Sequence, residues 1–180
     1  MIETILAATD LSERSDVALR RAVERAEALG AALHIACVVD DVMPHDMCET
    51  LCTEARARLE AFVASLGGAE PPVLHIRIGD PLAVIHAIAD KIRADLLVFG
   101  VHRSRPFLDL VSATTMERLV RGGPRPVLVV RDAADAPYGQ VLAGLDVSPA
   151  SAAAIRLAAT VAPGAEINGF HAVHIPARRL

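Results

Sequence analysis

The segment Leu96-Leu97-Val98-Phe99, which runs directly into Gly100-Val101-His102-Arg103, decides how the chain folds. Four consecutive apolar residues are typical of a strand buried on both faces of a sheet, and the glycine predicts where that strand ends. Residues 113–115, Ala-Thr-Thr, then open a predicted helix. Open α/β sheets commonly build anion sites from a buried strand, a loop and a helix N-terminus of this kind. The stretch from residue 96 to residue 116 is therefore the candidate site.

The composition of the chain limits the kind of protein and the kinds of partner that we expect. The 180 residues are 53% hydrophobic and contain no tryptophan, so we expect a well-filled core of aliphatic side chains. The net charge of −4 provides no basic field for nucleic acid or for an anionic membrane, and we expect neither as a partner. No apolar run approaches the roughly 18 residues of a membrane span, and the first residues carry no secretory signal. The three cysteines form no disulfide framework, so we expect a cytoplasmic protein.

Short apolar runs alternate with amphipathic stretches on both sides of this segment. Ser12 can cap a helix that Gly30 ends, and Asp80 with Pro81 opens another. The predicted strands cover residues 5–8, 33–39, 73–78, 96–99 and 126–131, and the predicted helices cover residues 13–29, 47–66, 81–93 and 112–121. This alternation predicts an α/β fold with an open, parallel, doubly wound sheet.

The pattern begins again after residue 139. Residues 141–148 match residues 5–12 position by position and share Leu, Ala, Asp and Ser. We therefore expect a complete domain over residues 1–132, a linker over residues 133–139, and a partial second copy over residues 140–180 that stops after strand, helix and strand.

Several short motifs, in this order and spacing, resemble the universal stress protein family. They are Thr9-Asp10-Leu11-Ser12 after the first strand, Gly79-Asp80-Pro81, the Gly-x-His of the loop, and the apolar run 126–131. The resemblance covers the first copy as a whole domain and the second copy as the opening strand, helix and strand. It implies a five-stranded Rossmann-like sheet of the adenine nucleotide alpha hydrolase-like type, in strand order 3-2-1-4-5. It also implies a stress-response or signalling module.

The resemblance further implies an adenine nucleotide site, with ATP as the ligand. The adenine would lie near Asp10 and Val38. The phosphates would lie on the loop and the helix start, which correspond to Gly100, Arg103, Ala113, Thr114 and Thr115. Nucleotide-binding members carry Gly, two residues, Gly, nine residues, Gly and then Ser or Thr. Here Arg103 and Ala113 replace two of those glycines.

Both replacements fall where backbone should meet phosphate. A left-handed alanine at position 113 would cost about 1–2 kcal/mol, and its methyl would stand in the ligand's path. Arg103 could pair with a phosphate in bidentate fashion, or its side chain could fill the pocket. Two interpretations therefore stay open: a module that binds ATP through a degenerate loop, and a protein interaction module whose phosphate site is blocked. Thr114 with Glu117 also forms a capping box that needs no ligand.

Other residue patterns give weaker indications of a functional site. His45, Cys48 and Cys52 have the spacing of metal ligands on a helix, but cysteine is also a common core residue and we expect no metal. No nucleophile elbow, zinc-protease or Walker motif is present, so we expect no enzyme beyond slow, incidental ATP hydrolysis. The resemblance implies a homodimer, or pairing of the tandem copies, through strand 126–131.

Overall fold

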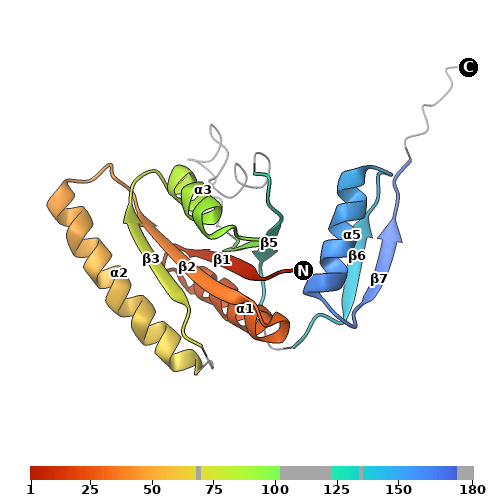
Figure 1. The fold of residues 1–180 in the computed structure, drawn as a ribbon, viewed down its shortest axis with the longest axis horizontal. Helices are drawn as coiled ribbons and strands as arrows, with labels where there is room; N and C mark the ends of the chain where they lie inside the picture. Colours follow the sequence, from red (N-terminus) through yellow and green to blue (C-terminus); the bar gives the residue numbers. More distant parts are fainter. Residues whose placement is uncertain (68–69, 102–122, 134–135, 174–180) are drawn as a thin grey trace, which may run out of the picture. The chain divides into compact units, whose positions relative to one another are not determined.

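The computed structural model describes residues 1–67, 70–101, 123–133 and 136–173 (Figure 1). The chain divides into two compact units, residues 2–134 and residues 135–180. Each unit has its own sheet. We describe the two units separately.

The first unit is a five-stranded parallel sheet in the order β3-β2-β1-β4-β5, which confirms the predicted fold class. Its elements are β1 (Thr4–Thr9), α1 (Glu13–Leu29), β2 (Ala32–Val39), α2 (His45–Leu66), β3 (Val73–Ile78), α3 (Pro81–Ile92), β4 (Leu96–Gly100) and β5 (Val127–Val130). The helix predicted over residues 112–121 lies outside the described residues.

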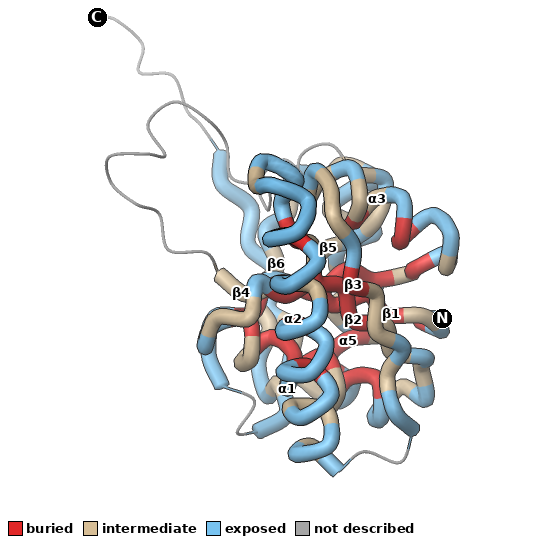
Figure 2. Tube along the Cα trace, turned by 90° about the vertical axis from the view of Figure 1, so that its left-hand side faces the viewer, coloured by how far each residue is buried: buried red, intermediate tan, exposed pale blue. Residues whose placement is uncertain are grey.

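Helices cover both faces of this sheet. Figure 1 shows α1 and α2 on one face and α3 on the other. Buried residues, red in Figure 2, concentrate in the strands of this sheet, and the helices contribute others. On the α3 face, Leu6, Ala36 and Leu97 pack against Ile85 and Ile88. The core is mainly aliphatic, as the composition predicts, and Phe99 of β4 is also part of it.

Local signals set the ends of α1. The Ser12 hydroxyl accepts a hydrogen bond from the Ser15 amide at 3.3 Å, and Gly30 ends the helix in the left-handed conformation at φ +64°. Those are the N-cap and C-cap that the two residue types favour. Asp80 caps α3 in the same way through the Ala83 amide at 2.8 Å. The prediction placed the start of α2 at residue 47, whereas the helix begins at His45, directly after Pro44. No side-chain cap marks that start.

In its described residues, 136–173, the second unit is a parallel two-stranded sheet with one helix. It contains β6 (Gln140–Gly144), α5 (Pro149–Val161) and β7 (Glu166–Phe170). Its first turn repeats that of the first unit, because Val147 has φ +64° where Leu11 has φ +63°, and Ser148 caps α5 through the Ser151 amide. The interpretation of residues 140–180 as a partial family copy stays a prediction. Among the described residues, no helix has the length and apolar character needed to cross a bilayer.

Candidate functional site

Three of the predicted site residues lie side by side at the carboxyl edge of the sheet. Thr9 of β1 pairs with Cys37 of β2, which places Asp10 next to Val38. Ala8 pairs with Phe99 of β4, which places Gly100 on the other side of the end of β1. The order β3-β2-β1-β4-β5 reverses direction between β1 and β4. Ligands of open α/β sheets bind at such a switch point, outside the carboxyl ends of the strands.

Asp10 is held as a carboxylate by the turn that follows β1. Its Oδ1 accepts from the Ser12 amide at 3.0 Å and from the Ser12 hydroxyl at 2.6 Å. Partial burial raises the pKa of Asp10, but the hydrogen bonds from Ser12 outweigh it and the pKa lies below its usual value. An ionised carboxylate offers acceptors alone. A ligand that meets Asp10 must therefore present N–H or O–H groups or a positive charge, and an adenine or a ribose presents such groups.

A buried network of hydroxyls fixes the turn around Asp10. Thr9 Oγ1 accepts from the Leu11 amide at 2.9 Å and donates to Ser15 Oγ at 2.8 Å, and Ser15 Oγ donates in turn to the Ser12 carbonyl at 2.8 Å. Thr9 and Ser15 are both buried. The network supports Leu11 at φ +63°, a backbone conformation that an apolar residue seldom adopts. The motif Thr9-Asp10-Leu11-Ser12 included Thr9, but neither Thr9 nor Ser15 was given a role in the site from the sequence, although hydroxyls at residues 9, 12 and 15 are a visible signal.

Gly100 has a packing role that holds with or without a ligand. A Cβ built on it would lie 2.8 Å from the Arg14 carbonyl oxygen and 3.2 Å from the Cα of Ser15. The first turn of α1 therefore approaches the end of β4 so closely that only glycine fits. Sequence reasoning assigned Gly100 to phosphate, and the structure adds a second requirement for the same residue.

Val38 and Cys37 occupy opposite faces of β2 at this edge. Val38 is half-buried and packs against the core on the α3 face, so it offers an apolar wall beside Asp10. Cys37 is buried, and burial, together with the negative charges of Cys52 and Asp10, raises the pKa of its thiol to about 11. Cys37 is therefore a neutral thiol at physiological pH and not a nucleophile.

Apart from Gly100, the phosphate half of the predicted site lies outside the described residues. Arg103, Ala113, Thr114 and Thr115 all fall within residues 102–122. Their roles stay predictions from the sequence.

His45, Cys48 and Cys52, which have the sequence spacing of metal ligands, are not arranged around a common metal position. His45 Nε2 lies 3.3 Å from Glu49 Oε1, and Cys48 is buried with its sulfur 3.5 Å from the carbonyl oxygens of Asp40 and Met43. In the part of the chain that the structure describes, no three His, Cys, Asp or Glu side chains are arranged to hold a metal ion. All three cysteines are free.

Residues 1–131 match the sequence profile of the Universal stress protein family. The universal stress protein UspA from Lactobacillus plantarum is 23% identical with a TM-score of 0.61, over 72% of this chain and 98% of its own. A universal stress protein solved in complex with cAMP is 27% identical with a TM-score of 0.54, over 72% and 97% of the two chains.

A protein of the same family from Burkholderia pseudomallei is 26% identical with a TM-score of 0.55, over 72% of this chain and 96% of its own. The chain has no significant match among curated proteins.

Proposed function

Because this chain belongs to the universal stress protein family, we propose that it is a cytoplasmic stress-response or signalling module that binds an adenine nucleotide between β1 and β4. The observation that carries the proposal is the alignment of Asp10, Val38 and Gly100 at the ends of three adjacent strands. The structural neighbour that contains cAMP supports the same ligand class. The family itself supports the stress-response role.

Asp10 and Val38 contact the nucleoside in different ways, one through its ionised carboxylate and the other through its apolar side chain. Asp10 accepts hydrogen bonds from the base or the ribose, and Val38 packs against the flat face of the ring. Neither residue suits a phosphate, because a carboxylate repels it and a valine cannot donate to it. The phosphates are left to the loop, where Arg103 supplies a cation.

A second candidate function is a protein interaction module without a ligand. The observation that favours it is the packing role of Gly100. Because the close approach of α1 already requires a glycine at this position, the presence of that glycine is no evidence for a phosphate site. In this alternative Arg103 and Ala113 block the phosphate site. Neither candidate assigns a catalytic residue, and any ATP hydrolysis would be slow.

Calorimetric titration with ATP and with cAMP tests the first candidate. We expect Asp10→Asn to weaken nucleotide binding about tenfold, because a neutral amide is a poorer acceptor than a carboxylate while it still accepts from Ser12. Asp146→Asn is the matched control, because Asp146 accepts from Ser148 at 3.0 Å in the equivalent turn of the second unit. This control should leave nucleotide binding unchanged.

The double variant Arg103→Gly with Ala113→Gly separates the two candidates. In the interaction-module candidate, the side chains of Arg103 and Ala113 block the phosphate site, so removing both should restore binding of ATP. In the first candidate, Arg103 supplies a cation to the phosphates, so its loss should weaken binding of ATP. If the natural sequence binds no nucleotide and the double variant does, the first candidate is wrong for this protein and the interaction module takes its place.

A further inference from the structure

Three large apolar side chains are exposed at the N-terminal end of α2. Val42 is 86% exposed, Met47 51% and Leu51 36%. Met47 and Leu51 are one helical turn apart and are therefore neighbours on the helix surface. We call Val42, Met47 and Leu51 the α2 patch. Single exposed apolar residues need no explanation, but Met47 and Leu51 adjoin on one helix face and Val42 lies in the turn that leads into this helix, a concentration typical of an interaction surface.

The exposure of Val42 is built into the turn that precedes α2. Asp40 Oδ1 accepts from the Val42 amide at 3.1 Å, which closes a turn that directs Val42 outward. Cys48 is 1% exposed and its sulfur lies 3.5 Å from the carbonyl oxygens of Asp40 and Met43. These contacts hold the turn against the buried side of α2. The α2 patch is therefore already exposed in the unbound protein.

Within residues 40–54 the charges have one sign, and the exposed Arg56 and Arg58 follow in the next turns of α2. Asp40, Asp41, Asp46, Glu49 and Glu54 are all exposed. Residues 40–54 contain no Lys or Arg, and the one histidine, His45, lies 3.3 Å from Glu49. An anionic rim of this kind repels nucleic acid and acidic lipid surfaces and attracts cations.

We propose that the α2 patch docks a partner protein through an amphipathic helix that has an apolar face flanked by lysines or arginines. Met47 supports this occupant because methionine adapts its shape to the surface it meets. The apolar side chains supply the contact area, and the acidic rim selects a basic helix over an acidic one. Met47 and Leu51 lie on α2 and Val42 lies in the turn before it, whereas the proposed nucleotide lies between β1 and β4.

A synthetic helical peptide of Leu and Lys, about 15 residues long, is the probe. Fluorescence anisotropy with the full chain should show binding of this peptide, and no binding of a second peptide in which Glu replaces every Lys. Leu51→Asp and Val42→Asp should each weaken binding of the basic peptide about tenfold. Leu142→Asp is the matched control, because Leu142 is 71% exposed on β6 in the second unit and should leave binding unchanged.

The direction in which Leu51→Asp changes the peptide affinity distinguishes docking on the patch from non-specific electrostatic attraction between the acidic protein and the basic peptide. Leu51→Asp makes the protein more negative, so general attraction would strengthen binding of the basic peptide, whereas loss of an apolar contact weakens it. Unchanged or stronger binding in both patch variants overturns the proposal. Equal binding of the acidic peptide overturns it as well. Co-sedimentation with phosphatidylcholine vesicles that depends on Leu51 would assign the patch to a lipid surface instead. Val42→Asp keeps the test valid if Leu51→Asp unfolds, because Val42 is almost fully exposed.

Discussion

At the end of β4, Gly100 has a packing role in addition to the role in ligand binding that we propose for it. An alanine methyl at this position would lie 2.8 Å from the Arg14 carbonyl oxygen, so α1 would have to move away from the sheet. We expect Gly100→Ala to lower the free energy of unfolding by about 1–3 kcal/mol, the usual cost of overpacking. Gly139→Ala is the control, because nothing lies within 4 Å of a Cβ built there. Urea denaturation followed by circular dichroism measures both, and equal stability of the two variants would leave Gly100 with its ligand role alone.

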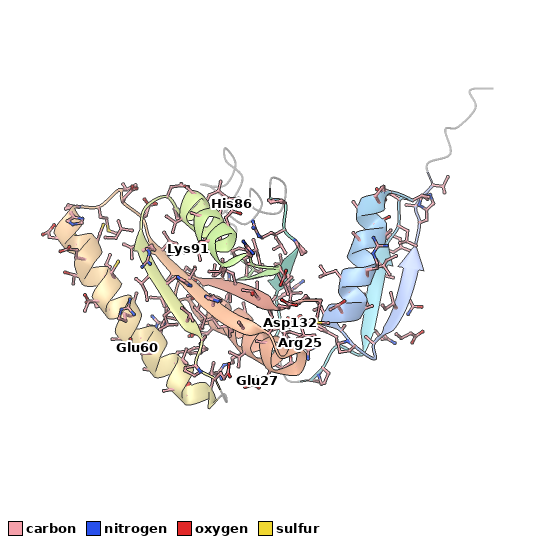
Figure 3. The ribbon with its side chains drawn as sticks, viewed as in Figure 1. Arg25, Glu27, Glu60, His86, Lys91 and Asp132 are labelled. Carbon is pink, nitrogen blue, oxygen red and sulfur yellow. The ribbon has the colours of Figure 1, made fainter. Side chains whose placement is uncertain are left out.

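At the scale of elements, two histidines join the edge strand β3 to β2. His34 Nδ1 lies 2.9 Å from His75 Nε2, so one ring nitrogen donates and the other accepts. Burial lowers the pKa of both rings, and the positive charges of His34, Arg77 and Lys91 lower that of His75 further. Lys91 is on α3, beside the sheet (Figure 3). The pair cannot take two protons and keep its hydrogen bond.

The stability of the chain should therefore depend on pH through this pair. Because the folded pKa values lie below the unfolded value near 6.5, the unfolded chain binds more protons as the pH falls below that value. The free energy of unfolding should be steady above about pH 6.5 and should decrease below it. His34→Gln with His75→Gln should flatten this decrease in urea denaturation series, and His86→Gln on α3 is the control. A double variant with the slope of the natural sequence would contradict the role of the pair.

The elements follow from local signals, whereas the close contacts between them do not. Ser12, Gly30 and Asp80 act within a few residues of themselves, so the caps of α1 and α3 could be predicted from the sequence. The approach of Gly100 to Arg14 and the pairing of His34 with His75 arise only when distant segments pack together. The turn at Asp10 was predictable as a motif. Its buried support from Thr9 and Ser15 depends on how α1 meets β1.

At the scale of the whole molecule, the outer edge of β5 carries the proposed pairing through residues 126–131. β5 ends the sheet, and Val129 is 39% exposed. In the part of the chain that the structure describes, no strand pairs with that outer edge. An apolar edge strand with free backbone groups is a template for another strand, and a twofold axis would pair two copies of β5. Val73 on the opposite edge strand, β3, is 51% exposed and provides a comparison.

We expect light scattering after size exclusion to give a mass of about twice 19.0 kDa for the natural sequence. Val129→Lys should shift the chain to a monomer, because a lysine on an edge strand opposes pairing with another edge. Val73→Lys introduces the same charge on the other edge of the same sheet and should leave the dimer intact. Dissociation by Val73→Lys alone would move the interface to β3. A natural chain that elutes as a monomer near 19.0 kDa would rule out the homodimer and leave pairing with the second unit of the same chain as the remaining use of this edge.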